Sequence, residues 1–364
     1  EWAHTTVRTG EDASGRWARN DFGAMVARAT AWAYICADAN ATTCAGKCMR
    51  LYRPAGGKRR KSVAKWAGKQ VTSRPRKEYL KSLGVGVKAS MYAEYAEEVE
   101  EVTEHPLLDL LRNPSEFMGG TELASLQFWY REICGNSFDM LIGPRNGAPT
   151  GLAFMMPHYT RIIPSKEEFI HGYVYGRDGA IEDVFEPEEV FHRKFRQSPF
   201  SPYNGIGPLF AVLAEADLDS ARNESEKASW LNGARPDFVI MAPAGVTQEQ
   251  IDQLKTKVNG EVRGPRNKGR FLVMSEAKIE PLSWSMKEME YLGGMGNIRE
   301  RILAAFGIPL SRVMVTEVSR ANGETGEAQY QRDTIMPRLS QNAESITERL
   351  LPEYGVEPGE MWLA

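Results

Sequence analysis

The stretch LFAVLAEADLDSARNESEKASWLN, residues 209–232, is the most informative part of this chain. It predicts a long helix, which would span roughly 36 Å at 1.5 Å per residue. Its first half is apolar, whereas its second half carries charged side chains on most faces. A helix of this composition is not simply packed in its own core. We therefore expect it to project from the body of the protein or to lie between subunits.

A compact α/β module is expected after this helix. Apolar runs predict strands at 238–242, 271–274 and 278–282. A capping box at 247–250 opens a predicted helix that runs to about residue 258, and 260–269 is a basic loop. A second capping box at 285–288 opens a helix that ends before Gly307-Ile-Pro309. Two long helices are thus predicted to enclose a small module.

The second long helix contains the glycine cluster Gly293-Gly-Met-Gly296. At roughly 1 kcal/mol per glycine, this cluster predicts a bend or a break. A polar loop at 312–322 and a final helix at 323–351 follow. Pro337 lies inside that final helix and predicts a kink, because proline lacks an amide hydrogen and clashes with the preceding turn.

The N-terminal part mixes helices with strands. Helical spacing marks 24–48, 105–114 and 123–133, and a short strand is expected at 49–53. Alternation with a period of two predicts an antiparallel meander over 135–195, in which 153–163 is one strand. The segment 58–81 is strongly basic, and 94–104 is acidic. This pair is interpreted either as a solvated insertion or as two faces that meet between neighbouring subunits.

Composition excludes several classes of protein. The formal net charge is −3, from 45 basic and 48 acidic residues, which argues against tight DNA binding over the whole surface. No apolar run reaches the roughly 18 residues of a membrane span. No secretory signal precedes the cysteines Cys36, Cys44, Cys48 and Cys134, which are expected to be reduced and packed. The chain begins with Glu1 and is expected to be a piece of a longer product.

Motifs that carry enzymatic chemistry are missing from the sequence. It has no phosphate-binding loop, no nucleophile elbow and no zinc-protease motif. The histidines are scattered singly: His4, His105, His158, His171 and His192. We therefore expect no catalytic residues, no metal site and no cofactor.

A series of short motifs runs through the chain in a recognisable order. The motifs are Ala31-Trp-Ala-Tyr-Ile-Cys36, Leu51-Tyr-Arg53, His105-Pro-Leu-Leu-Asp-Leu-Leu-Arg-Asn-Pro114, Gly135-Asn-Ser-Phe138, Glu189-Val-Phe-His192, Asn232-Gly-Ala-Arg-Pro236, Ala305-Phe-Gly-Ile-Pro309, Tyr330-Gln-Arg-Asp-Thr-Ile-Met-Pro-Arg-Leu339 and Leu350-Leu-Pro352. In this order, from about Trp32 to Leu351, the chain resembles the large portal family of long-tailed, double-stranded DNA phages.

The resemblance implies an α+β portal fold with a wing, a two-helix stem, a small α/β clip and a kinked helix after a tunnel loop. Its parts would be 1–206 (wing, with the basic insertion 58–81), 207–234 (first stem helix), 235–284 (clip), 285–309 (second stem helix), 310–322 (tunnel loop) and 323–364 (kinked helix and return to the wing). A crown would be missing or would lie beyond Ala364.

The resemblance also implies a homo-oligomeric ring, commonly of twelve subunits, at one capsid vertex of the virion. Double-stranded DNA would pass through it during packaging and ejection. The expected partners are the terminase large subunit, the major capsid protein and head-completion or adaptor proteins, with assembly in the host cytoplasm and no membrane. The rival interpretations are a capsid or baseplate component without a channel, or, much less favoured, a metal-dependent nuclease.

Candidate residues follow from this scheme. Acidic stem residues would repel phosphates from the channel wall: Glu215, Asp217, Asp219, Glu224 and Glu226. Cations that could centre the duplex are Arg312 and Arg320 in the loop, with Lys287 and Arg299 as weaker candidates. The basic clip loop would dock the motor or connector proteins through Arg263, Arg266, Lys268 and Arg270.

Overall fold

The computed structural model describes residues 21–54, 66–71, 99–144, 147–165, 167–176, 183–231, 238–241, 278–281, 291–313 and 320–364. The chain divides into two compact units, one formed by 1–213 with 302–364 and the other by 214–301. The divisions fall within two long helices. Each unit is described by itself.

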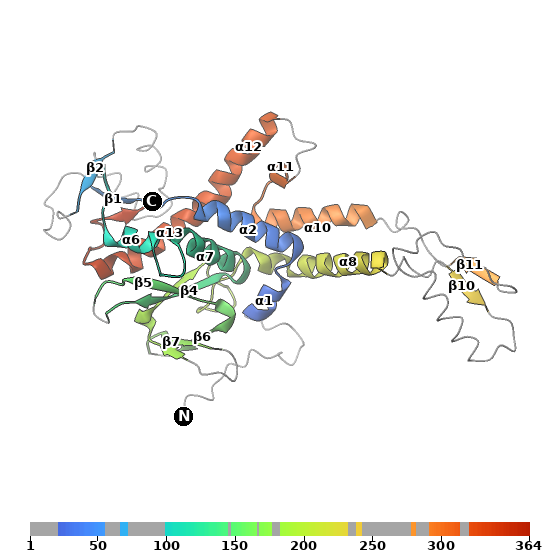
Figure 1. Ribbon diagram of the computed structural model, residues 1–364, viewed down its shortest axis with the longest axis horizontal. Coiled ribbons are helices and arrows are strands. Elements are labelled where there is room, and N and C mark those ends of the chain that lie inside the picture. Colours follow the sequence, from blue (N-terminus) through green and yellow to red (C-terminus); the bar gives the residue numbers. More distant parts are fainter. Residues whose placement is uncertain are drawn as a thin grey trace, which may run out of the picture. The chain divides into compact units, whose positions relative to one another are not determined.

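The first unit begins with two helices, α1 (Phe22–Arg28) and α2 (Ala31–Ala45). One helix was predicted over 24–48, and this was wrong. Thr30 is extended, and Ala31 has a φ of 46°, a left-handed conformation that breaks the helical path. Asp21 caps α1 by accepting a hydrogen bond from the Ala24 amide (2.9 Å). α2 then packs along α7 (Gly120–Cys134) (Figure 1).

α6 (Pro106–Arg112) and α7 form where the sequence predicts helices. His105 precedes α6, and its Nδ1 accepts from the Leu107 amide (3.1 Å). α7 ends at Gly135, which has a φ of 76°. A Cβ there would collide with the backbone of Ile206, so only glycine allows the chain to turn directly into the next strand.

Four strands form an antiparallel sheet of order β12-β1-β3-β2. They are β1 (Leu51–Pro54), β2 (Gly68–Gln70), β3 (Val99–Val102) and β12 (Trp362–Leu363). β12 was not predicted, and it brings the C-terminal residues back beside β1. Gly68–Gln70 belongs to the predicted basic insertion, yet it is an edge strand of this sheet.

The acidic side chains of β3 find partners within the same subunit. Glu100 pairs with Arg53 (2.8 Å), and Glu101 pairs with Arg50 (3.1 Å). These two carboxylates are therefore neutralised without a neighbouring copy. The rest of the predicted basic segment and most of the predicted acidic segment lie outside the described residues.

The predicted meander is instead two separate three-stranded antiparallel sheets, of order β5-β4-β9 and β6-β7-β8. The strands are β4 (Asn136–Ile142), β5 (Gly151–Met155), β6 (Thr160–Pro164), β7 (Ile170–Tyr175), β8 (Asp183–Phe185) and β9 (Val190–Lys194). The predicted single strand at 153–163 is broken by the 3₁₀ turn η1 (Pro157–Tyr159), because Pro157 cannot donate to a strand ladder. A second such turn, η2 (Pro187–Glu189), precedes β9, which then pairs with β4.

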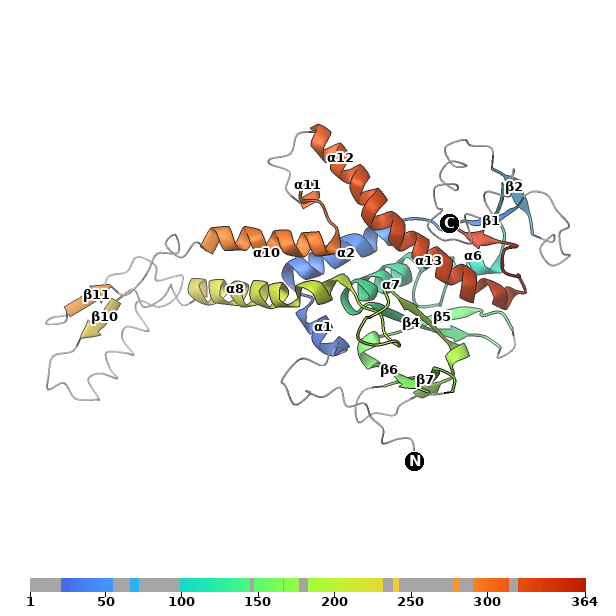
Figure 2. The ribbon, with the colours of Figure 1, turned by 180° about the vertical axis from the view of Figure 1, so that it is seen from behind.

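The C-terminal helical region begins with α11 (Leu310–Val313). α12 (Arg320–Tyr330), a π-helical turn η5 (Gln331–Ile335) and α13 (Met336–Arg349) follow one another as a long run (Figure 2). The predicted loop at 312–322 is thus helical at both ends. A kink was predicted at Pro337, and the structure has the π turn η5 directly before it, because proline cannot supply the amide that an α-helical turn needs there. The chain then passes through η6 (Leu351–Tyr354).

The main core joins residues that are far apart in the sequence. Leu51 of β1 and Leu107 of α6 are almost completely buried in one cluster with Ile346 of α13 and Leu350, which directly follows α13. Because α13 supplies this cluster from the end of the chain, the helical run that follows the predicted tunnel loop is anchored in the body of the first unit.

The second unit contains most of α8 (Leu213–Leu231) and of α10 (Tyr291–Phe306), with β10 (Phe238–Met241) paired antiparallel to β11 (Lys278–Pro281). A short turn, η3 (Pro208–Val212), leads into α8 in the first unit. Within the second unit, Arg301 of α10 pairs with Glu215 of α8 (3.3 Å). The predicted helix at 247–258, strand at 271–274 and basic loop lie outside the described residues.

A bend or a break was predicted at Gly293–Gly296, and the break was wrong, because α10 is continuous through these glycines. Each glycine lowers helix propensity by about 1 kcal/mol, but tertiary packing routinely outweighs propensity. Ile298, Ile302 and Phe306 are buried farther along the same helix. Among the described helices, none is both long and apolar enough to cross a membrane.

Candidate functional site

The C-terminal end of α10 is where the predicted tunnel-loop segment begins. Gly307 has a φ of 72°, and its amide donates to the Ala304 carbonyl (3.1 Å). The Ile308 amide donates to the Leu303 carbonyl (2.9 Å). This pattern is a Schellman motif, which requires a left-handed residue that glycine supplies most readily. Pro309 follows and cannot continue the helix, so the sequence Phe306-Gly-Ile-Pro309 ends α10 sharply.

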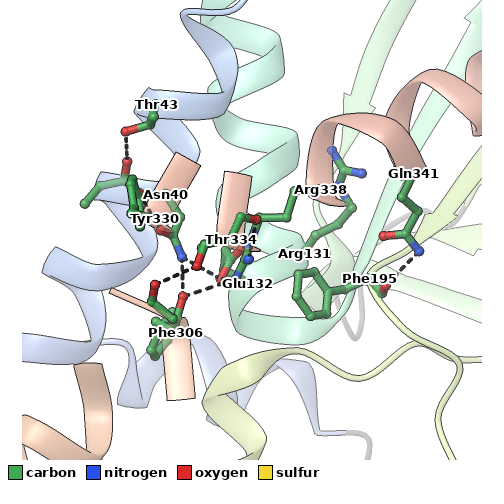
Figure 3. Close-up of polar contacts among 12 residues, drawn as sticks. Asn40, Thr43, Arg131, Glu132, Phe195, Phe306, Tyr330, Thr334, Arg338 and Gln341 are labelled. Carbon is green, nitrogen blue, oxygen red and sulfur yellow. Dashed lines mark hydrogen bonds and ion pairs between the residues drawn. The ribbon is translucent and has the colours of Figure 1, made fainter. Parts of the chain in front are cut away.

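Side chains from three other helical segments satisfy the carbonyls at this end. The Phe306 carbonyl accepts from Asn40 Nδ2 (3.0 Å) and from Arg338 Nη2 (3.3 Å), and the Gly307 carbonyl accepts from Thr334 Oγ1 (2.6 Å) (Figure 3). The last carbonyls of a helix have no partners within the helix and carry partial negative charge. Arg338 therefore complements both their hydrogen-bonding need and their charge.

Glu132 of α7 and Arg338 of α13 form a buried ion pair. The Glu132 side chain is 1% exposed, and the Arg338 side chain is 10% exposed. Arg338 Nε donates to Glu132 Oε1, and Arg338 Nη2 donates to Oε2 (3.1 Å). Asn40 Nδ2 also donates to Oε2 (3.2 Å), while Arg338 Nη1 donates to the Thr334 carbonyl (2.7 Å). The two parallel contacts of this ion pair, together with the additional hydrogen bonds, offset the free-energy cost of removing both charges from water.

We call this cluster the Glu132 network, which comprises Glu132, Arg338, Asn40, Thr334 and the carbonyls of Phe306 and Gly307. It joins α2, α7, the end of α10, the π turn and α13. The sequence prediction missed it. The only signal was the placement of Asn40 and Glu132 within otherwise apolar helical faces, and nothing in the sequence paired them with Arg338.

The buried cysteines lie near this network. Burial, reinforced by the negative charge of Glu132, raises the pKa of Cys36 and of Cys44 to about 12. Cys36, Cys44 and Cys134 are buried as expected, whereas Cys48 is exposed. The buried thiols therefore stay protonated and unreactive. In the described part of the chain, no three His, Cys, Asp or Glu side chains gather where they could hold a metal ion.

Arg312, a predicted DNA-centring residue, lies in α11 and is already engaged. Its Nη1 is 3.7 Å from Glu327 Oε1, and its Nη2 donates to Thr43 Oγ1 (3.3 Å). Its guanidinium carbon lies 4.3 Å from the centre of the Tyr330 ring. Burial raises the pKa of Tyr330, whose hydroxyl donates to Asn40 Oδ1 (2.7 Å). Arg312 is therefore connected to the Glu132 network through one tyrosine.

The structure describes the other predicted cations only in part. Arg320 is the first residue of α12. Arg299 lies in α10, and its Nε is buried without a hydrogen-bond partner among the described residues. Lys287 and the four basic clip residues Arg263, Arg266, Lys268 and Arg270 lie outside the described residues.

The predicted acidic residues of α8 divide into two kinds. Asp217 and Glu224 are exposed, as repulsion of phosphates would require. Glu215 is paired with Arg301, and Asp219 is buried. No environment is described for the Glu226 side chain. The exposed negative charge on this helix is therefore smaller than its composition indicates.

A second buried cluster lies around Asp139 of β4. Its Oδ2 accepts from Arg193 Nη2 (2.5 Å), and its Oδ1 accepts from Gln127 Nε2 (2.8 Å). Arg193 also donates to Asn342 Oδ1 (2.7 Å). Nearby, burial and then the charge of Arg193 lower the pKa of Arg131 to about 9. This cluster joins β4 and β9 to α7 and α13.

These features describe an α+β protein in which a buried polar network surrounds the C-terminal end of α10. The family model for phage portal proteins matches residues 86–361. The chain belongs to the phage portal protein family. No curated protein matches the chain in sequence.

Solved structures share this fold. A neck structure of an empty gene transfer agent particle, computed with C6 symmetry, is similar with a TM-score of 0.60 and 18% identity, over 94% of this chain and 83% of that chain. A neck structure of a native particle, computed with C12 symmetry, gives 0.52 and 21%, over 83% and 87% of the two chains. An HK97-family phage portal protein from Corynebacterium diphtheriae gives 0.50 and 12%, over 91% and 92%.

Proposed function

We propose that this chain assembles with copies of itself into a closed ring, of twelve subunits, at one vertex of a capsid. Double-stranded DNA passes through the ring during packaging and ejection. The observation that carries this proposal is the portal-family match over residues 86–361. The fold shared with neck structures computed with C6 and C12 symmetry supports the ring.

The ring requires two different complementary faces on each subunit, because head-to-tail contacts must close on themselves. It belongs to the virion and assembles in the host cytoplasm. Its further partners are the terminase large subunit, the major capsid protein and head-completion or adaptor proteins. The subunit itself is not an enzyme, since the portal family is structural and hydrolysis of ATP falls to the separate motor.

The channel wall guides DNA by weak repulsion and by a few cations. Asp217 and Glu224 of α8 supply exposed negative charge. Arg320 at the start of α12, together with Lys287 and Arg299, supplies candidate cations. Arg312 is less available than its place in the predicted loop indicates, because Glu327, Thr43 and the Tyr330 ring lie against its guanidinium group.

The test of the ring is direct imaging of the purified protein. Top-view averages by negative-stain electron microscopy are expected to show a roughly twelve-fold ring with a central hole. Closed shells, flat sheets or only monomers would overturn the proposal. Magnesium-dependent cleavage of DNA that disappears on substitution of one acidic cluster would favour a nuclease instead.

Docking of the motor is assigned to the basic loop of the clip. Replacing Arg263, Arg266, Lys268 and Arg270 together by glutamine removes four positive charges from one loop. Binding of the terminase large subunit to assembled rings is expected to weaken at least tenfold, while ring formation is unchanged. Unchanged terminase affinity would remove these residues from the proposal but leave the ring intact.

A further inference from the structure

Three residues of the same subunit contact the guanidinium group of Arg312. Glu327 provides the opposite charge (3.7 Å), Thr43 accepts a hydrogen bond (3.3 Å) and the Tyr330 ring covers one face (4.3 Å). We call these four residues the Arg312 clamp. An arginine that binds a phosphate needs its fork of donors free to face the ligand. In the clamp, one terminal nitrogen of that fork donates to Thr43 of α2, and the other faces the Glu327 carboxylate of α12.

The charge of Arg312 is also largely cancelled locally. Glu327 is about half exposed, and its Oε1 also accepts from Gln331 Nε2 (2.8 Å). The carboxylate is therefore held beside Arg312 by a second contact on its own helix. The pair as a whole is close to neutral, and a neutral pair adds little to the attraction of DNA phosphates.

An independent feature shows that α11 is packed closely on α12. A Cβ at Gly326 would lie 2.5 Å from Ser311 Oγ and 3.9 Å from Pro309 Cβ. Glycine at this position thus leaves room for the short helix α11. Ser311 and Arg312 are adjacent, so α11 contacts α12 through the serine and reaches both α2 and α12 through the arginine.

The clamp is connected to the buried Glu132 network. Tyr330 is 2% exposed, and its hydroxyl donates to Asn40 Oδ1 (2.7 Å). Asn40 in turn donates to Glu132 and to the Phe306 carbonyl at the end of α10. The position of α11 is therefore coupled, through Tyr330 and Asn40, to the buried residues that surround the C-terminal end of α10.

We propose that Arg312 is a positioning residue, which holds α11 against α2 and α12 and so sets where the chain leaves α11 at Val313. It makes no contact with DNA phosphates. The statement about DNA phosphates rests on the proposed channel, whereas the positioning of α11 does not, because all the contacts of the clamp lie within one subunit. Phosphate contact falls to other cations, of which Arg320 at the start of α12 is the nearest in sequence.

The first experiment measures hydrogen exchange of the backbone amides in peptides covering 305–330, in assembled rings without DNA. The single variants R312E and E327R place like charges together and are expected to speed exchange in α11 and the first turns of α12 about tenfold. The exchanged pair R312E–E327R restores opposite charges and is expected to recover most of the protection. R312Q gives an intermediate effect.

The matched control is R332Q. Arg332 is an exposed arginine on the π turn, paired with its neighbour Asp333 (2.7 Å), so this variant removes the same charge without touching α11. Exchange in 305–330 should stay at the wild-type rate. If R312E–E327R exchanges as fast as the single variants, or if R332Q matches R312Q, the positioning role is overturned.

The second experiment measures how the affinity of assembled rings for a short DNA duplex depends on salt. Loss of one phosphate contact lowers the slope of log affinity against log salt by about one. For R312Q the slope is expected to be unchanged from wild type. A slope lower by about one would show a phosphate contact and overturn the inference. If the rings bind too little DNA for a slope to be measured, the exchange experiment alone decides the role of Arg312, and the imaging of the ring separately decides the channel.

Discussion

Two arginine–glutamate ion pairs of the first unit have the same chemistry but lie in different environments. Arg338 and Glu132 are buried, with two parallel contacts and several further hydrogen bonds. Arg312 and Glu327 are partly exposed, and their closest charged atoms are 3.7 Å apart. A buried charge without its partner is severely destabilising, whereas an exposed pair contributes little free energy. We therefore expect loss of one partner of the buried pair to lower the free energy of unfolding strongly. The exposed pair is expected to affect mainly the position of the short helix α11.

The largest effect is expected from removing one member of the buried pair. R338M leaves Glu132 charged and buried without its ion-pair partner, and should reduce the free energy of unfolding by about 3–5 kcal/mol. Chemical denaturation of the purified protein measures this. The double variant E132L–R338M removes both charges and should regain a large part of the loss. If R338M is no more destabilising than R332M on the surface, the buried pair does not have this role.

His192, a half-buried residue held neutral by its surroundings, provides a comparison with the charged pair. His192 lies between Asn136 Oδ1 (3.0 Å) and Tyr173 (3.5 Å), and burial followed by the charge of Lys194 lowers its pKa to about 3. In the unfolded chain its pKa is near 6.5, so the unfolded state binds more protons between these values. Stability should therefore fall as the pH is lowered below 6.5, by about 2 kcal/mol down to pH 5.

The contribution of His192 is isolated by comparison with H192Q, whose side chain does not titrate. The difference in unfolding free energy between the two proteins should change between pH 6.5 and pH 5 and stay constant above pH 7. A constant difference over the whole range would show that His192 is not held neutral in the folded protein.

A smaller effect is expected at the end of α10. G307A places a Cβ in a left-handed conformation, 2.6 Å from Thr334 Oγ1. The conformational penalty alone is about 1–2 kcal/mol, and the displaced threonine loses its bond to the Gly307 carbonyl. Thermal denaturation should show the loss. G355A is a useful comparison, because its φ is 74° but a Cβ there meets nothing within 4 Å, so it should be less destabilising.

The smallest effect on stability is expected at the exposed pair. R312Q should change the free energy of unfolding by less than about 1 kcal/mol, because a partly solvated pair gains little Coulomb energy. Chemical denaturation should place it near wild type, although local hydrogen exchange of α11 increases. A loss as large as that of R338M would mean that the two pairs are energetically equivalent and would remove the distinction between them.

Much of the fold could be predicted from local patterns. Pro106 and the apolar spacing around it predict α6, alternation predicts the strands between 136 and 194, and Phe306-Gly-Ile-Pro309 predicts the end of α10. Local patterns failed where long-range packing decides. The glycines at 293–296 remain helical because residues farther along α10 are buried, and β9 pairs with β4 rather than with its neighbour in sequence.

The candidate site was predictable only in part. Arg312 and Arg320 were selected because they lie in the predicted tunnel loop, but a sequence does not show that Glu327, Thr43 and Tyr330 surround the first of them. The sequence by itself determined the types of many elements, the sharp end of α10 and the family. These features depend on residue-level conformational preferences and on hydrophobic periodicity. Only the tertiary structure decided which charges are paired, because ion pairs such as Glu132 with Arg338 join residues that approach each other only in the folded chain.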